Sequence, residues 1–393
     1  MTVHDDTRAT LASEPMNSAL ELDADWDALT PASLFLGWDH LEWWVGNARQ
    51  AAGFLAGTFG FRITAYAGPE TGRTDGTCSY VVEQGDVRFV LTGALGPHSP
   101  VASSVRAHGD GVRDIAITVS DARAAYEAAI ERGGAGLEAP WVTEDDDGQL
   151  VRATVAAYGD TQHTFVERAG YHGAFAPGFS AEGLPPAIVG APVGITRIDH
   201  VVANVEKGAL SSWVGFYRRV LGLEQLVHFD DEQISTEHSA LMSTVVWDGS
   251  KIVLPINEPA DGLRKSQIEE YLDSYGAPGV QHIAMHTDDI VATVSALRDR
   301  GVRFLRVPDE YYDDVRVRLG DLSLPWDELQ RLGVLVDRDE EGYLLQLFTE
   351  TVTDRPTVFF EVIQREGAKG FGAGNFKALF EAIEREQDRR GNL

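Results

Sequence analysis

The chain has 393 residues, which is room for two or three domains at ~100–200 residues each. Its formal net charge of −28 argues against nucleic acid and anionic membranes as partners, because both repel such a surface. Hydrophobic residues make up 44% of the chain, as in a folded globular protein.

The single cysteine, Cys78, cannot form an internal disulfide, and this predicts a cytoplasmic protein. The acidic N-terminus lacks the apolar core of a signal peptide. No apolar run approaches the ~20 residues that cross a bilayer, so no membrane association is expected.

The first half of the chain combines strand and helix patterns. Residues 1–35 have no clear period and are expected to form an arm. In the following domain, residues 36–175, helices are predicted over 48–59 and 122–132. Two apolar runs flank Gln84-Gly85-Asp86, which predicts a β-hairpin.

A segment rich in Pro, Gly and Ala, residues 176–193, is the expected linker to a second domain, residues 194–393. In this half a hairpin is predicted around Asp248-Gly249 and a helix over 290–300. From Phe376 onward, apolar residues recur at i, i+3, i+4 and i+7, which indicates an amphipathic C-terminal helix.

The two halves resemble each other. The stretch Gly111–Ala116 matches Gly279–Ala284, and the similarity continues without a gap for over twenty residues. Asp39-His40 matches Asp199-His200. Two copies of a strand–helix–strand–strand–strand unit in each half predict an α+β fold of two tandem domains, each an open curved barrel of paired βαβββ units.

Three candidate metal ligands lie on predicted strands whose other inward residues are mainly apolar. They are His200, His282 and Glu361. Two imidazoles and one carboxylate on one face of a metal leave three positions free, as in the facial triad of non-haem Fe(II) oxygenases. His286 shares a face with His282, but at ~6.5 Å along the strand we expect it to lie outside the metal shell.

In the first half, the positions equivalent to the three candidate ligands are predicted to be His40, Asp114 and Glu167. The prediction of Glu167 depends on a match of residues 163–167 to residues 356–361 that includes a small gap. We interpret this half as a structural copy without metal. A second metal site of mixed ligands is the alternative.

Several segments resemble the 4-hydroxyphenylpyruvate dioxygenase family of the vicinal oxygen chelate superfamily, over nearly everything from Gly37 to Leu393. The segments that carry the resemblance are Ile256–Pro259, Gly279–Ala284, Arg355–Glu361, Gly370–Phe376 and Arg390–Leu393.

This resemblance implies one Fe(II) per chain, held by His200, His282 and Glu361, with 4-hydroxyphenylpyruvate and O₂ as substrates and homogentisate and CO₂ as products. It further implies a homo-oligomer, a dimer or a tetramer, and a C-terminal helix that closes over the cavity. The catalytic polar positions would be Ser243, Asn257, Gln267, Gln281 and Gln346. The substrate-binding positions would be Phe348, Phe359, Phe371, Asn375 and Phe376.

The stretch from Ser243 to Asn257 is one residue shorter than the family pattern. A gap in the Asp248-Gly249 turn keeps Ser243 in the pocket, whereas a gap within the strand would turn it to the other face. Three other functions stay open: 4-hydroxymandelate synthase, which shares substrate and metal, an extradiol catechol dioxygenase, and a metal-free binding module.

Overall fold

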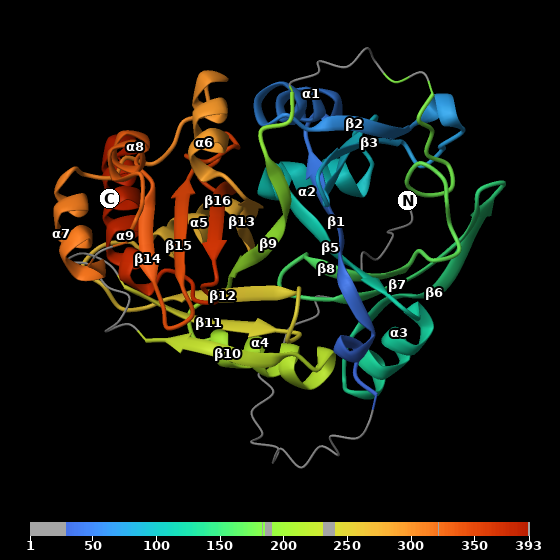
Figure 1. Cartoon of the computed structure of the whole chain (residues 1–393). Helices are drawn as coiled ribbons and strands as arrows, with labels where there is room; N and C mark the ends of the chain where they lie inside the picture. Colours follow the sequence, from blue (N-terminus) through green and yellow to red (C-terminus); the bar gives the residue numbers. More distant parts are fainter. Residues whose placement is uncertain (1–28, 183, 185–190, 231–239, 321, 392–393) are drawn as a thin grey trace, which may run out of the picture.

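The computed structural model describes residues 29–182, 184, 191–230, 240–320 and 322–391, and it shows two curved sheets side by side (Figure 1). Residues 1–28 of the expected arm lie outside the described residues. Residues Pro31–Leu34 form a 3-10 helix, and the first strand begins at Phe35.

The first sheet has eight strands in the order β2-β3-β4-β1-β5-β8-β7-β6, with three helices around it. Its strands are β1 Phe35–Val45, β2 Arg62–Ala67, β3 Thr77–Gln84, β4 Val87–Ala94, β5 Gly111–Val119, β6 Gly136–Asp145, β7 Gly148–Ala156 and β8 Gln162–Glu167. Its helices are α1 Ala48–Phe59, α2 Pro100–His108 and α3 Ala122–Glu131.

The second sheet repeats this topology in the order β10-β11-β12-β9-β13-β16-β15-β14. Its strands are β9 Ile195–Asn204, β10 Glu224–Phe229, β11 Leu241–Trp247, β12 Val253–Pro259, β13 Gly279–Thr287, β14 Leu335–Arg338, β15 Tyr343–Phe348 and β16 Phe359–Glu366. Its helices are α4 Leu210–Phe216, α5 Gln267–Tyr275, α6 Ile290–Asp299, α7 Glu310–Leu319, α8 Trp326–Leu332 and α9 Phe376–Arg390.

In both sheets the two central strands run antiparallel, and each pairs in parallel with the last strand of its own βαβββ unit. The predicted fold of tandem curved barrels with a C-terminal helix is therefore confirmed. Helices α7 and α8 are inserted in the last unit, between α6 and β14. None of the helices in the described part of the chain combines the length and apolar composition needed to cross a membrane.

Local sequence signals explain where the main helices begin. The side chains of Asn47, Asp121 and Asp289 each accept a hydrogen bond from a backbone N–H in the first turn of α1, α3 and α6. The hairpin glycine Gly85 has a positive φ of 57°, and a Cβ there would collide with the backbone of Thr196. The turn is thus specified by its own geometry and by contact with the other half.

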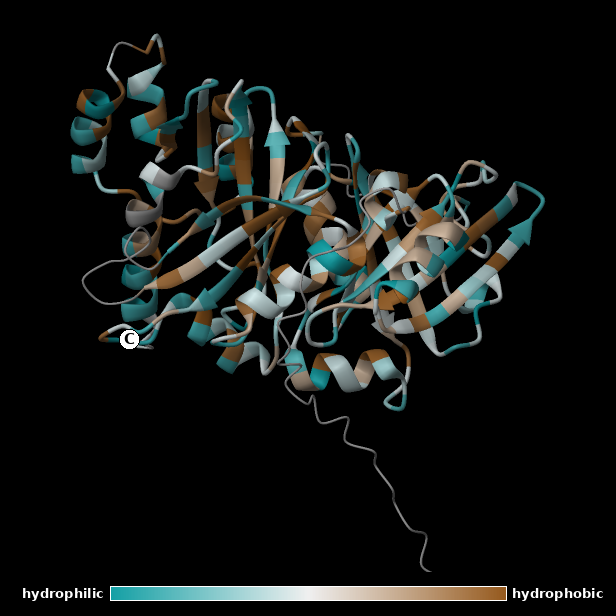
Figure 2. Cartoon of the chain, turned by 90° about the horizontal axis from the view of Figure 1, so that it is seen from below, coloured by the Kyte–Doolittle hydropathy of each residue, from teal (hydrophilic) through white to brown (hydrophobic). Residues whose placement is uncertain are grey.

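The two halves share one apolar core. On β16, Phe360 stacks on Phe89 with ring centroids 6.0 Å apart, and its centroid lies 5.9 Å from that of Trp43; both partners belong to the first half. Its neighbour Glu361 points to the opposite face because side chains alternate along a strand. Apolar residues of the central strands belong to the buried core. In the hydropathy view, brown apolar stretches alternate with paler and teal ones along the strands of both halves (Figure 2). The central strands of the second sheet are therefore covered on one face by the first half, and the other face lines the barrel.

Candidate metal centre and substrate pocket

Strand register brings the three candidate ligands together. In the central strands, Ala284 of β13 pairs with His200 of β9 on one side and with Glu361 of β16 on the other. His282 lies two residues before Ala284, hence on the same face. Because Ala284 has only a methyl side chain, the longer side chains of its neighbours can meet above it.

The distances are those of a metal site. Glu361 Oε2 lies 3.2 Å from His200 Nε2 and 3.4 Å from His282 Nε2. One ligand atom from each residue lies within 4.8 Å of the others, and all three residues are buried. Glu361 Oε1 is buried with no hydrogen-bond partner among the described residues. A cation bound between these atoms would satisfy that oxygen, so the donor set fits a divalent metal.

The second ring nitrogen of each histidine is also fixed. His200 Nδ1 lies 2.7 Å from Asp199 Oδ1, and His282 Nδ1 lies 3.0 Å from Gln281 Oε1. Both acceptors are oxygens, so each Nδ1 carries a proton, and each Nε2 is the nitrogen that is left to bind a cation at the centre of the group.

The ionisation of the group follows from burial and charge. Burial raises the pKa of Glu361, but the two imidazoles outweigh it and hold that pKa near 2. Burial lowers the pKa of His200, yet Glu361 and Asp199 raise it to about 9. For His282 burial prevails and the pKa is lowered. Without metal, the site therefore holds a carboxylate with a proton on His200, which a cation would displace.

The ligands open into a pocket with apolar walls and a few polar groups. Ser243, Asn257, Gln267, Gln281 and Gln346 all line it. Ser243 pairs directly with Asn257 in the β11–β12 hairpin, so both lie on the same face, and both line the cavity. This is the placement expected if the shortening falls in the Asp248-Gly249 turn. Phe348, Phe359 and Phe371 form aromatic walls, and the ring of Phe359 stacks on that of His282 at 4.8 Å.

The two remaining predicted pocket residues differ. Asn375 is fully buried, but it accepts a hydrogen bond from the Tyr311 hydroxyl (2.6 Å) and does not line the pocket. The side chain of Phe376 lies outside the described residues, although its backbone begins α9. The same helix contributes Leu379 and Phe380 to the cavity wall.

Comparisons with known proteins identify the family to which the chain belongs. The family model of the Glyoxalase/Bleomycin resistance protein/Dioxygenase superfamily matches residues 37–168 and 197–347. The chain is 47% identical to a 4-hydroxyphenylpyruvate dioxygenase from Dictyostelium discoideum, over 91% of this chain and 100% of that protein. It is 46% identical to the enzyme of that name from Danio rerio, over 91% and 92%. The chain belongs to the 4-hydroxyphenylpyruvate dioxygenase family.

A solved structure of a 4-hydroxymandelate synthase variant from Streptomyces coelicolor is also similar, with a TM-score of 0.80 and 38% identity over 90% of this chain and 99% of that one. The 4-hydroxyphenylpyruvate dioxygenase family and this neighbour thus share one architecture. The fold alone does not separate their activities.

Several pocket residues of this family member could not be recognised from their own sequence pattern, because apolar residues on strands and on the C-terminal helix are also typical of a protein core. These are Val202, Phe229, Leu241, Val245, Pro255, Leu379 and Phe380. The pairing of Asp199 with His200 had a visible signal, since Asp39-His40 repeats it in the first half.

The assignment of Glu167 to the third ligand position of the first half is wrong. Glu167 accepts a hydrogen bond from the backbone N–H of Ala122 at the start of α3, at 3.1 Å, as Gln364 does from Ile290 at the start of α6. Glu167 therefore corresponds to Gln364, and Thr164 corresponds to Glu361. The gap in the sequence match had shifted the strand by three residues.

Thr164 changes the chemistry of the first-half positions. Its hydroxyl donates to Asp114, and its backbone N–H donates to the same carboxylate at 3.0 Å. Burial raises the pKa of Asp114 to about 6, while His40 and the hydrogen bond from the Thr164 side chain oppose this rise.

His286 lies apart from the metal-ligand group, as predicted, and its Nδ1 is 2.9 Å from the Thr196 hydroxyl.

Proposed function

We propose that this chain converts 4-hydroxyphenylpyruvate and O₂ to homogentisate and CO₂, using one Fe(II) held by His200, His282 and Glu361. The convergence of these three side chains at the floor of an aromatic pocket carries the proposal. Two imidazoles and one carboxylate are the donor set of non-haem Fe(II) oxygenases, and they leave one side of the metal free. The family is one of oxygenases, and many of its members bear this enzyme's name at about 46% identity.

The metal would supply the oxidation: bound here, it activates O₂ for decarboxylation of the 2-oxo acid and hydroxylation of its ring. One O₂ is consumed for each CO₂ released, and both oxygen atoms of O₂ appear in the products. No separate 2-oxo acid is needed, because the substrate carries its own.

The protein's share of the work is binding and orientation. Ser243, Asn257 and Gln267 present hydroxyl and amide groups to the pocket, where they can hydrogen-bond the polar ends of the substrate. Phe348 and Phe359 lie edge to face, with centroids 6.2 Å apart, and offer apolar surface for an aromatic ring. Such a pocket positions the ring beside the metal with few waters near it.

Gln281 faces the pocket and also contacts the metal ligand His282. It lines the pocket, and its Oε1 accepts the Nδ1 proton of His282 at 3.0 Å. Its amide NH₂ is left to donate to substrate. We propose that Gln281 orients both the metal ligand His282 and the substrate. Helix α9 closes the pocket with Leu379 and Phe380.

The second candidate is 4-hydroxymandelate synthase, favoured by the structural neighbour of that name. It would use the same substrate and metal but hydroxylate the benzylic carbon, so a few pocket side chains decide the outcome. The curated relatives at 42–47% identity favour the homogentisate product.

Product identification tests the proposal. The purified protein is loaded with Fe(II) anaerobically, then given 4-hydroxyphenylpyruvate and O₂, and the products are separated by chromatography. We expect homogentisate and CO₂ in equal amounts. Hydroxymandelate as the main product would establish the second candidate, and unchanged substrate with intact metal binding would refute both.

We also propose that the first half is structural, since its ligand positions hold His40, Asp114 and Thr164 rather than the full triad. A cytoplasmic location and a homo-oligomer complete the proposal. Light scattering at several protein concentrations tests the latter, with a mass of one chain as the contrary result.

A further inference from the structure

Arg365 connects the metal ligand His200 to the segment that leads into α9. It lies on β16 four residues after Glu361, hence on the same face of the strand. Its guanidinium binds Asp199 through two nitrogens, Nε to Oδ2 at 2.8 Å and Nη2 to Oδ1 at 2.9 Å. Asp199 Oδ1 is also the atom that accepts the Nδ1 proton of His200.

The other side of the same guanidinium holds the closing segment, which we define as residues 368–375. Nη1 of Arg365 donates to the carbonyl of Gly370 and, at 3.4 Å, to that of Ala368. The guanidinium carbon lies 5.4 Å from the ring centre of Phe371, a cation–π distance. The Phe371 ring in turn meets His200 edge to face at 5.5 Å and lines the pocket.

We propose that Arg365 is a positioning residue that couples metal binding at His200 to the closed position of the segment 368–375. A guanidinium has five donors in a rigid plane, and here they are divided between a buried carboxylate and two loop carbonyls. Any change in the orientation of Asp199 and His200 is therefore transmitted to Gly370 and Phe371. The Asp199–Arg365 ion pair is well buried, because the side chain of Asp199 is only 9% exposed and that of Arg365 only 14%.

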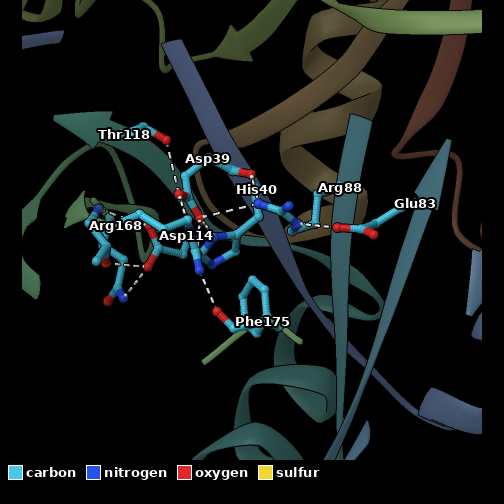
Figure 3. A network of polar contacts seen from close by, with 10 residues as sticks. Asp39, His40, Glu83, Arg88, Asp114, Thr118, Arg168 and Phe175 are labelled. Atoms are coloured by element: carbon cyan, nitrogen blue, oxygen red, sulfur yellow. Dashed lines mark hydrogen bonds and ion pairs between the residues drawn. The ribbon is translucent and has the colours of Figure 1, made fainter. Parts of the chain in front are cut away.

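The first half contains the same arrangement without the full set of metal ligands. Arg168 binds Asp39 through two nitrogens at 2.7 and 2.8 Å, and Asp39 Oδ1 lies 2.7 Å from His40 Nδ1 (Figure 3). Arg168 also donates to the carbonyl of Phe175 and lies over its ring at 5.1 Å. This copy is a matched control, because its loss reports the purely structural cost of the cluster.

The test compares Arg365→Gln with Arg168→Gln. Fe(II) affinity is measured by anaerobic calorimetry, and hydrogen exchange of residues 366–376 is followed with and without metal. Loss of an outer-shell partner typically weakens metal binding 10–100-fold, and we expect this for Arg365→Gln but not for Arg168→Gln. In the wild type and in Arg168→Gln, metal should slow exchange in the segment, and Arg365→Gln should lose this response.

Arg365→Lys keeps the charge but not the planar fork, so its metal affinity should lie between those of the wild type and Arg365→Gln. It also serves if the Gln variant does not fold. Equal metal affinity in the two Gln variants, or no effect of metal on exchange in the wild type, would overturn the proposal.

The inference rests on the proposed metal site but not on the reaction. Wild type and Glu361→Gln are titrated alongside: equal Fe(II) binding by both would refute the metal site itself. Binding that depends on Glu361 together with an Arg365→Gln variant that behaves like the control would refute only the coupling.

Discussion

Glu361 combines two features that a structural carboxylate rarely shows together. Its Oε2 lies within 3.4 Å of two imidazole nitrogens, and its Oε1 is buried without a hydrogen-bond partner among the described residues. A buried, half-satisfied carboxylate is costly to the fold unless a cation binds it.

Replacing Glu361 with Gln removes the negative charge while keeping the shape. We expect Fe(II) affinity to fall by more than the ~10–100-fold typical of losing an outer-shell partner, and most turnover to disappear. O₂ uptake in an electrode cell with 4-hydroxyphenylpyruvate measures this. Glu366→Gln, an exposed position on the same strand, is the matched control and should stay near wild-type rates. Near-normal O₂ uptake by Glu361→Gln would contradict the ligand assignment.

At the scale of elements, prediction succeeded where a local signal is strong. The side-chain caps of Asn47, Asp121 and Asp289 mark helix starts that the structure places at the predicted residues. The two hairpin turns were recognisable from glycine next to Asp or Gln. Helices α2, α5, α7 and α8 were not predicted, since their short apolar patterns are hard to distinguish from strands and loops.

The site itself was only partly accessible from the sequence. His200, His282 and Glu361 are far apart in the chain, and no local motif announces them, so the duplication and the family resemblance carried the assignment. The shift that placed Glu167 opposite Glu361 arose because the short sequence match with its small gap could not fix the register of this strand. The structure corrects this register, because the side chains of Glu167 and Gln364 accept equivalent hydrogen bonds from the backbone N–H groups that begin α3 and α6.

The start of α9 depends on Tyr311. Its hydroxyl donates to Asn375 Oδ1 at 2.6 Å and accepts from the backbone N–H of Val336 at 2.9 Å. We expect Tyr311→Phe to cost about 1–3 kcal/mol of stability, because buried polar groups lose their partner. Urea unfolding measures this cost.

If α9 protects the reaction as proposed, Tyr311→Phe should also consume more O₂ per homogentisate formed than the wild type, while Fe(II) affinity stays unchanged. Tyr343→Phe, which removes a hydroxyl from a partly buried position on β15, is the control. A Tyr311→Phe enzyme with wild-type coupling and stability would contradict the role of this contact.

At the scale of the whole molecule, the two halves are bridged by a buried imidazole. His163 Nε2 of β8 lies 2.9 Å from the Tyr217 hydroxyl of the second half, and Nδ1 lies 3.1 Å from the carbonyl of Ile115. The carbonyl can only accept, so Nδ1 carries the proton and Nε2 accepts from Tyr217. Burial lowers the pKa of His163 to about 4 from its usual 6.5.

This pKa shift predicts a pH dependence of stability. Between pH 6.5 and 4 the unfolded chain binds a proton that the folded chain does not, so stability falls as pH falls. From pH 7.5 to 5 the contribution is about 2 kcal/mol. Urea unfolding at both pH values should show His163→Gln losing that much less stability than the wild type. Tyr217→Phe keeps the imidazole and should keep the dependence. The same change in the free energy of unfolding between the two pH values in wild type and His163→Gln would contradict the role of His163.

The duplication makes a second prediction at this scale. If Asp114 and Thr164 occupy the positions of His282 and Glu361, then Asp114→His combined with Thr164→Glu should build a second site with His40. Anaerobic dialysis against Co(II) should find two ions per chain in place of one. Asp114→His alone is the control, since it would complete a triad only if Glu167 held the third position. Two ions bound by that single variant, or one ion bound by a folded double variant, would contradict the assignment.

The central claim is that one Fe(II) at His200, His282 and Glu361 presents its free side to a 2-oxo acid in the pocket. Anaerobic visible absorption tests this most directly, because a 2-oxo acid that chelates Fe(II) gives a charge-transfer band. We predict a new band that needs protein, Fe(II) and 4-hydroxyphenylpyruvate together, saturates at one equivalent of each, and is absent in Glu361→Gln. No band in the wild type, or the same band in Glu361→Gln, would contradict the account.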